Sequence, residues 1–328
     1  MKFLEKPQLG VTPLKIFIDC VNEYTGTPHN EVSIKKAAEK RKRLLRCKGV
    51  VERSAKLYED TIPHQDFEEP ALPKGVSPTE LENVYNDKFV KGKKGRTYYD
   101  LIRGGTKYGR CPICDAKGIE LQLDHYLPKS KYPTLCVNPD NLIPICGSCN
   151  GIKNAKTFSS QEGMLLHLYM DRLPEKIDDY GELHVEQFLF ADIDAHFVVT
   201  YHVKCPADWD STFRQRFENH MKLYNLTNKY NDCAKLEYSE IYSLWKHRTK
   251  KHIKALVNEQ EPNPEKRKQR YNELMSCYDD TWLLRTIICE KADDDEYDHN
   301  SWQSVLYNAL KFRVDDFAQW LEANNENP

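Results

Sequence analysis

The first third of the chain places apolar residues at helical spacing among charged ones. Within residues 34–57 apolar positions recur at near-helical spacing between charged residues; they are Ala37, Ala38, Leu44, Leu45 and Val51. A second helix is predicted to begin near Ser77 and Pro78 and to include Leu81, Val84 and Tyr85. Glycines mark predicted loops before a cysteine-rich segment; they are Gly92, Gly95, Gly104 and Gly105. The pattern predicts a mostly helical region over residues 1–105.

Beyond residue 160 the pattern is first extended and then helical. Residues 185–193 and 197–203 are rich in Val, Phe and Tyr, which predicts a strand pair. A helical stripe follows; it consists of Trp209, Phe213, Phe217, Met221 and Tyr224. Further helices are predicted at residues 228–257, 264–291 and 301–323. For the last of these helices, Asn300 is the predicted N-cap and Gln303 completes a capping box.

The composition excludes disordered and membrane-spanning proteins. Of the 328 residues, 40% are hydrophobic and 11% aromatic, enough for a sizeable core in two or three domains. Mean hydropathy is −0.73, and no apolar run approaches the roughly 18 residues of a spanning helix. The N-terminus places Glu5 and Lys6 where a signal peptide has an apolar stretch. We therefore expect a cytoplasmic protein without a membrane segment.

The net charge of −2 conceals a difference between the two halves of the chain. Residues 1–158 carry 27 Lys and Arg against 19 Asp and Glu, whereas residues 159–328 carry 21 against 31. The basic excess lies in residues 35–53, with nine basic and two acidic residues, and in residues 88–110, with eight and one. Either run alone suits a solvated helix face, but two runs before a metal-ligand motif favour a polyanionic partner.

Four of the eleven cysteines form two C-x-x-C pairs, namely Cys111 with Cys114 and Cys146 with Cys149. Four thiolates with this spacing suit tetrahedral Zn²⁺. The 31 residues between the pairs exceed the usual gap of a zinc finger, so we expect a folded segment with zinc at its base. The other seven cysteines are isolated, and we expect them in or near the core; they are Cys20, Cys47, Cys136, Cys205, Cys233, Cys277 and Cys289.

The segment between the cysteine pairs carries residues suited to hydrolysis. Asp124 precedes His125, Asn138 and Asn141 follow, and Asn150 comes directly after the fourth cysteine. Neutral imidazole can deprotonate water near pH 7, whereas carboxylate and amide oxygens suit Mg²⁺. A second Asn can hold the imidazole by its other nitrogen. Because adjacent strand residues point to opposite faces, Asp124 and His125 can share a site only where a strand bends or ends.

The pattern C-x-x-C…L-D-H-Y-L-P-K-S…Y-P…N-P-x-N-L-I-P-x-C-x-x-C-N-x-x-K closely resembles the HNH endonucleases, whose module is the ββα-metal fold. It looks most like the HNH nucleases of bacterial anti-phage defence loci such as Septu-type systems, in which an ATPase is often encoded beside the nuclease. The core of the resemblance covers about 50 residues. The GRTYYDLI segment before it, and the strand pair and Trp209 helix after it, look similar as well.

The resemblance implies a role for each residue of the site. His125 would be the general base, and Asp124 and Asn150 would hold Mg²⁺, with Mn²⁺ as an alternative ion. Asn150 stands where many members have a final His, which could alter the metal preference. Asn141 would orient His125; Asn138 is a rival for this role. Candidates for phosphate contacts, each of which could instead be merely solvated, are Lys129, Lys131 and Lys153.

The predicted fold class is α+β. A zinc-framed ββα-metal HNH module at residues 106–160 lies between a basic, mostly helical region at 1–105 and a C-terminal region at 161–328 with a strand pair and helices. The predicted activity is metal-dependent hydrolysis of DNA phosphodiester bonds. An RNA or tRNA nuclease with the same site and a non-catalytic zinc-ribbon binding module are the alternatives. The resemblance also suggests a co-encoded ATPase, which the acidic C-terminal region would dock.

Overall fold

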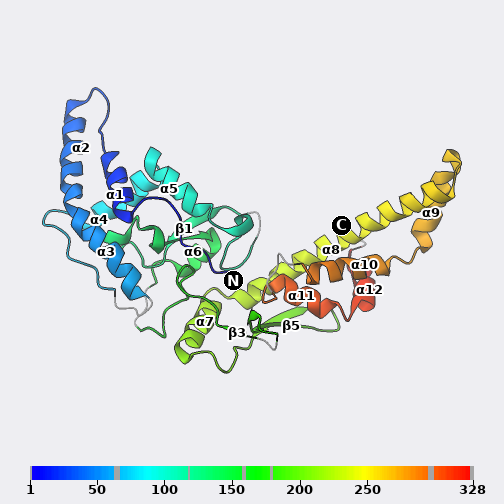
Figure 1. Cartoon of the computed structure of the whole chain (residues 1–328). Coiled ribbons are helices and arrows are strands. Elements are labelled where there is room, and N and C mark those ends of the chain that lie inside the picture. The colour runs from blue at the N-terminus through cyan, green and yellow to red at the C-terminus, as the bar shows by residue number, and fades with distance from the viewer. Residues whose placement is uncertain are drawn as a thin grey trace. The chain divides into compact units, whose positions relative to one another are not determined.

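The computed structural model describes residues 2–62, 67–116, 119–156, 160–177, 180–294 and 299–325. The chain forms two compact units (Figure 1). The first contains Met1–Pro174 and Trp209–Tyr224, and the second contains Glu175–Asp208 and Asn225–Pro328. The helices of the N-terminal region, the cysteine-rich segment and the Trp209 helix therefore belong to one unit.

The first unit is mostly helical. Its helices are α1 (Pro13–Asn22), α2 (Glu31–Leu44), α3 (Lys48–Thr61), α4 (Pro78–Asn83), the π-helical segment η3 (Val84–Phe89), α5 (Lys93–Arg103), α6 (Gly147–Lys153) and α7 (Ser211–Leu223). The single helix predicted at residues 34–57 is wrong in detail, because a 3₁₀ turn at Leu45–Cys47 separates α2 from α3. The predicted start near Ser77 is confirmed: Ser77 caps α4 and forms a capping box with Glu80.

The strands of the cysteine-rich segment form one antiparallel hairpin. Strand β1 (Leu121–His125) pairs with β2 (Leu142–Cys146), with Leu121 opposite Cys146 and His125 opposite Leu142. Helix α6 follows β2 directly, and Cys146 is its N-cap. This ββα order and the mixed fold class agree with the prediction. Short 3₁₀ turns precede and interrupt the hairpin; they are Lys107–Gly109, Pro133–Leu135 and Pro139–Asn141.

The hairpin and the preceding helices share one hydrophobic core. Buried side chains of α1, α4, η3 and α5 pack with residues from β1, β2 and their connection; the cluster includes Ile16, Phe17, Leu81, Val84, Phe89, Ile102, Leu123, Cys136, Val137 and Leu142. The helical region is thus part of the structure that positions β1, rather than a separate attachment. Burying these side chains stabilises the hairpin by roughly 1.5–3 kcal/mol per large apolar residue.

Helix α5 corrects the prediction of a loop at Gly95. The glycine lies inside α5, and a Cβ atom at this position would be 2.0 Å from the Lys88 carbonyl oxygen and 2.5 Å from the Phe89 Cα. Helix α5 therefore approaches the backbone of η3 more closely than any side chain permits. Glycine serves this packing, and its presence does not mark the end of a helix.

We expect Gly95→Ala to lower the free energy of unfolding by about 2 kcal/mol or more, since the added methyl group meets rigid backbone. Gly49→Ala is the matched control, because Gly49 lies in α3 with nothing within 4 Å of its added Cβ. The control is expected to be neutral or to stabilise by about 0.5–1 kcal/mol through helix propensity. Chemical denaturation measures both, and equal effects of the two substitutions would contradict the packing argument.

The second unit combines two hairpins with helices. The elements are β3 (Glu175–Ile177), β4 (Leu183–Val185), β5 (Leu189–Ile193), β6 (Val199–Val203), α8 (Leu226–Gln260), α9 (Pro264–Cys277), α10 (Thr281–Ala292), α11 (Trp302–Leu310) and α12 (Val314–Asn325). Strand β3 pairs with β4 and β5 pairs with β6, both antiparallel. The β5–β6 pair matches the predicted strand pair, whereas the β3–β4 hairpin was not predicted.

Two of the predicted long helices are interrupted. The helix expected at 264–291 is α9 and α10, and that expected at 301–323 is α11 and α12. The first break brings Asp280 against α8, where its carbonyl accepts from Trp245 Nε1 at 3.0 Å. The predicted N-cap at Asn300 is wrong by one residue: Ser301 caps α11, because Asn300 Oδ1 accepts instead from the Phe188 backbone N–H at 2.8 Å. No described helix is long and apolar enough to cross a membrane.

Candidate active site and metal centre

The two C-x-x-C pairs meet at the base of the hairpin. Cys111 and Cys114 precede β1, Cys146 ends β2 and Cys149 lies in α6. All four are buried, and their sulfur atoms lie within 4.8 Å of one another. Four thiolates at about 2.3 Å from Zn²⁺ in a tetrahedron stand about 3.8 Å apart, and Cys114 Sγ lies 3.8 Å from Cys146 Sγ. The cluster therefore has the donors and the spacing to bind one zinc ion.

Backbone groups favour the thiolate form of the cluster. The N–H of Cys146 points to Cys111 Sγ, and the N–H of Cys149 points to Cys146 Sγ, both at 3.4 Å. Hydrogen bonds among the four thiols lower the pKa of Cys114 and Cys146 and raise the pKa of Cys111 and Cys149. A metal ligand must be deprotonated, and the two backbone N–H groups favour the thiolate form of the sulfurs to which they point.

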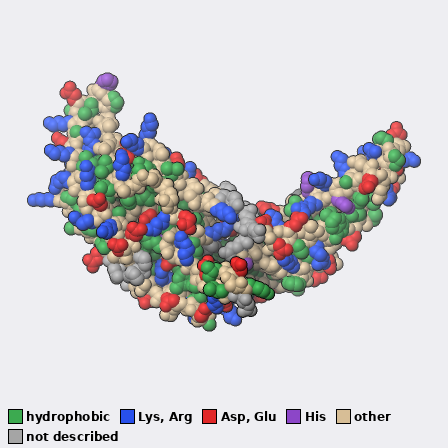
Figure 2. Space-filling model, in the orientation of Figure 1, with side chains coloured by type: hydrophobic (Ala, Val, Ile, Leu, Met, Phe, Trp, Pro, Cys, Tyr) green, Lys and Arg blue, Asp and Glu red, His purple; other side chains and the backbone are tan. Residues whose placement is uncertain are grey.

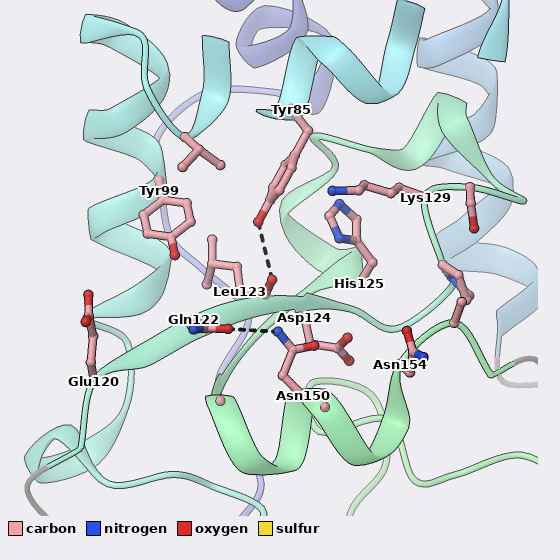
Figure 3. A pocket seen from close by; sticks show the side chains of 16 residues that line it. Tyr85, Tyr99, Glu120, Gln122, Leu123, Asp124, His125, Lys129, Asn150 and Asn154 are labelled. Atoms are coloured by element: carbon pink, nitrogen blue, oxygen red, sulfur yellow. Dashed lines mark hydrogen bonds between the residues drawn. The ribbon is translucent and has the colours of Figure 1, made fainter. Parts of the chain in front are cut away.

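A pocket of about 680 Å³ opens beside this centre, and residues from β1 and α6 line it together (Figure 3). Asp124 and His125 come from the end of β1, and Asn150 comes from α6. These are the residues predicted for the general base and the Mg²⁺ ligands, and the structure brings all three to one pocket. The strand ends at His125, so the two adjacent residues can both reach it.

His125 is held by a backbone carbonyl. Its Nε2 lies 2.9 Å from the Cys136 oxygen, and the Tyr85 ring packs edge-on with centroids 4.4 Å apart. A carbonyl oxygen only accepts, so Nε2 carries the hydrogen and Nδ1 keeps the lone pair. Burial lowers the pKa of His125 to about 3. The imidazole is therefore neutral near pH 7, and Nδ1 is the atom able to take a proton.

Asn141 does not make the predicted contact with His125. Its Oδ1 accepts from the Leu127 N–H at 2.7 Å and from the Tyr58 hydroxyl at 3.1 Å, and its Nδ2 donates to the Leu127 carbonyl at 3.0 Å. The side chain thus holds the segment after β1 in place, while Cys136 orients the imidazole. The rival Asn138 is also used elsewhere, since its Oδ1 accepts from the Asp140 N–H at 3.3 Å.

Asp124 is buried, and its charge is balanced from within the module. Lys153 Nζ lies 2.9 Å from Asp124 Oδ2 and donates to the His125 carbonyl at 2.6 Å. Burial raises the pKa of Asp124, and the charge of Lys153 opposes that shift. The predicted role of Lys153 in phosphate contact is wrong, because its side chain is 2% exposed and points inward from the last turn of α6.

We expect Lys153→Met to lower the free energy of unfolding by about 3 kcal/mol, because the Asp124 carboxylate would remain buried without a partner. The double variant with Asp124→Asn should regain much of the lost free energy of unfolding, since it has no unpaired charge buried at this position. Lys156→Met is the matched control at an exposed position close by, with an expected effect within about 0.5 kcal/mol. Chemical denaturation distinguishes these outcomes, and a Lys153→Met chain as stable as wild type would contradict the buried ion pair.

Gln122 holds the side chain of Asn150 and was not predicted from the sequence. Its Oε1 accepts from Asn150 Nδ2 at 3.1 Å (Figure 3), which turns the Asn150 oxygen away from Gln122. The alternation of strand residues was the available signal, because Gln122 lies two residues before Asp124 and so shares its face. A carboxylate and an amide oxygen in one pocket fit a hard divalent cation.

The two other predicted lysines differ in position. Lys129 lines the pocket, with its Nζ donating to Asn86 Oδ1 at 2.7 Å and lying 4.5 Å from the Tyr85 ring centroid. Burial lowers the pKa of Lys129. Lys131 is exposed and does not line the pocket. Tyr85, Tyr99 and Glu120 also line the pocket, and none of the three was predicted from the sequence to do so.

Comparison with known proteins identifies this module. Residues 111–156 match the family model described as HNH endonuclease, which confirms the resemblance seen in the sequence and indicates a nuclease. The chain is 33% identical over 172 residues to protein ea31 of Escherichia phage lambda, covering 51% of this chain and 54% of that protein. It is 36% identical over 63 residues to the Septu protein PtuB of Bacillus thuringiensis, covering 18% and 24%.

The matched segments thus span about half the length of one curated relative and a quarter of the other. The partial similarity to PtuB supports the resemblance to nucleases of defence loci. No solved structure matches the chain.

Proposed function

We propose that this protein is a metal-dependent endonuclease that hydrolyses DNA, with His125 as its general base and one Mg²⁺ held by Asp124 and Asn150. The observation that carries the proposal is the convergence of these three side chains on one pocket beside the four-cysteine cluster. A zinc-ribbon that only binds nucleic acid has no need of a neutral imidazole and two oxygen donors in a shared pocket.

The chemistry follows from the orientation of His125. Nδ1 takes a proton from a water molecule as the water oxygen attacks phosphorus, while the Cys136 carbonyl keeps the ring in place through Nε2. The bond from phosphorus to the 3′ oxygen breaks, and the leaving oxygen takes a proton from solvent water, which gives a 5′-phosphate and a 3′-hydroxyl. A Mg²⁺ ion bound by Asp124 and Asn150 would stabilise the negative charge on the phosphate and on the leaving oxygen. Lys129 lies in the same pocket, where its ammonium group can face a phosphate.

The basic runs supply a surface for the nucleic-acid backbone in the same unit. In the first run, exposed side chains follow α2 and the turn after it; they are Lys35, Lys36, Lys42, Arg46 and Lys48. In the second run Lys91, Lys93 and Lys94 are exposed beside α5. Contacts of this kind bind phosphate without reading bases. We therefore propose that any sequence preference is weak or is supplied by another component.

Cleavage assays with plasmid, single-stranded DNA and RNA test the proposed substrate. Purified protein should cut DNA with Mg²⁺ or Mn²⁺, and chelation should stop the reaction until the ion is restored. Cleavage of RNA alone would replace the proposal with the RNA or tRNA nuclease. Binding without cleavage of any of the three, under every metal condition, would support the non-catalytic zinc-ribbon instead.

We further propose that the protein acts in anti-phage defence together with a co-encoded ATPase. Residues 161–328 would bind this ATPase. The similarity to PtuB supports this role, although the similarity to the phage lambda protein covers more of the chain. Cells carrying the native locus should resist phage, and the same locus with His125→Ala should not. Equal phage plating on both strains would exclude the defence role, and co-purification with the neighbouring gene product would identify the partner.

A further inference from the structure

The second unit contains a basic segment within an acidic half of the chain. Residues 159–328 carry ten more acidic than basic residues, but residues 246–270 carry nine Lys and Arg against three Asp and Glu. This segment is the distal part of α8 and the first half of α9. Helix α9 folds back along α8 beyond the other helices of the unit (Figure 1). Helices α8 and α9 therefore carry a basic segment although residues 159–328 as a whole are acidic.

A groove of about 610 Å³ lies between the two helices, and its lining is strongly basic. Helix α8 contributes Lys250, Lys251 and Lys254; Lys254 lies three residues after Lys251 and four after Lys250, one helical turn from both. Helix α9 contributes Arg267 and Lys268. No Asp or Glu is among the described residues that line the groove. Lys, Arg and His side chains are visible along this part of the molecule in Figure 2.

Most of the charges that line the groove have no acidic partner among the described residues. Lys250, Lys251, Lys254 and Lys268 are exposed, and none of them forms an ion pair with a residue that the structure describes. Basic residues on the same helix but outside the groove differ. Lys246 pairs with Glu322 at 2.7 Å, and Arg248 pairs with Glu290 at 2.8 Å. The cations of the groove are thus available to an external anion.

The floor of the groove suits a partner with flat apolar groups as well as negative charge. Val257 is 3% exposed and lines the groove together with the half-buried Tyr271. Nucleobases stack on tyrosine rings, whereas phosphates bind lysine and arginine. Residues 247–254 of α8 extend over about 11 Å, which is enough for about three successive phosphates of one strand at about 3.4 Å each.

We propose that the groove between α8 and α9 binds the sugar–phosphate backbone of a nucleic acid at a site separate from the catalytic pocket. The choice of a nucleic acid as the polyanion rests on the proposed function, but binding in the groove does not require that the protein cleaves it. The nuclease would hold its substrate with two units of the chain: one carries the reacting groups, and the other adds affinity without sequence preference.

The test compares two full-length variants with equal change of charge. Lys250→Glu, Lys251→Glu and Lys254→Glu are combined in the groove variant. The control combines Lys204→Glu, Lys222→Glu and Lys235→Glu, which are exposed positions outside the groove. Fluorescence anisotropy without added divalent cation gives the Kd for a short duplex DNA, a single strand and an RNA of the same sequence. The measurements are repeated over a range of salt concentrations.

We expect the groove variant to raise the Kd for DNA, RNA or both at least tenfold and to reduce the salt slope by about 2–3, as loss of three phosphate contacts predicts. The control should change the Kd less than threefold. A groove variant that binds like wild type, or a control with the same loss, would overturn the proposal. Sedimentation with vesicles of equimolar phosphatidylserine and phosphatidylcholine is measured beside these. A groove variant that keeps its affinity for all three nucleic acids but loses binding to the vesicles would also overturn the proposal, since the groove would then bind a membrane surface.

The cleavage assays distinguish this result from the proposed function. If the groove variant loses affinity while wild type cuts no substrate, the groove is a binding site and the nuclease assignment fails. If wild type cuts DNA and the groove variant keeps its affinity, the nuclease assignment holds and the groove proposal fails.

Discussion

Replacing His125 by alanine is expected to slow DNA cleavage by about 10²- to 10⁴-fold while leaving the affinity for DNA nearly unchanged. A general base acts in the transition state and contributes this order of magnitude to the rate. The neutral imidazole, with Nε2 bonded to the Cys136 carbonyl and Nδ1 available, is the group that would take the proton. Single-turnover rates with saturating protein separate this chemical step from binding.

His196→Ala is the control, because His196 is exposed and lies in the turn between β5 and β6. It should cut at the wild-type rate. The His125 variant should retain the zinc content and the circular dichroism of wild type, since removing the ring does not touch the cysteine cluster. Cleavage by His125→Ala at the rate of the control would show that another group is the base.

Replacing Cys111 or Cys149 by serine is expected to abolish zinc binding and to unfold the hairpin with α6. Zinc–thiolate bonds contribute folding free energy directly, about 10–16 kcal/mol in small zinc-binding modules. The hairpin also shares its core with α1, α4 and η3, so the damage should spread through the first unit. Elemental analysis should give one zinc per wild-type chain and almost none in either variant.

Cys277→Ser is the matched control, because Cys277 is exposed on α9 and lies outside the cluster. It should keep both the zinc and the cooperative unfolding of wild type. Wild-type protein that contains no zinc, when purified without chelators, would contradict the proposed role of the four cysteines. The two sets of variants separate catalysis from the zinc site, since His125→Ala should lose activity with zinc retained.

The residues of the metal centre were predictable because their chemistry is local. Each C-x-x-C pair places two thiols on one turn, and the strand–turn–strand pattern between the pairs brings the turns together. Asp124 and His125 end a strand, and Asn150 follows a cysteine of the cluster in α6, so their positions in the sequence indicated a shared site. The isolated cysteines were less uniform: Cys20, Cys47 and Cys136 are buried as expected, but Cys277 is exposed.

The interactions between these residues were not predictable, because they join atoms that are distant in sequence or belong to the backbone. No side-chain motif marks the Cys136 carbonyl that holds His125. The ammonium group of Lys153 could be assigned to the interior only after α6 was placed against β1. The extent of the helices also depended on packing. Gly95 lies inside α5 because the helix packs closely against η3, and Asn300 does not cap α11 because its side chain bonds to the backbone of Phe188.

Residue types and short spacing in the sequence by itself singled out the four thiols and the imidazole of His125, and the resemblance to the HNH endonucleases predicted the ββα order. The tertiary structure decided which lysine lies inside and which lysines remain available to an anion. Lys153 balances a buried carboxylate, whereas Lys250, Lys251 and Lys254 line an open groove. The residue type is the same in both places. A lysine ammonium group can be buried only where a nearby carboxylate offsets the free energy lost on removing the charge from water.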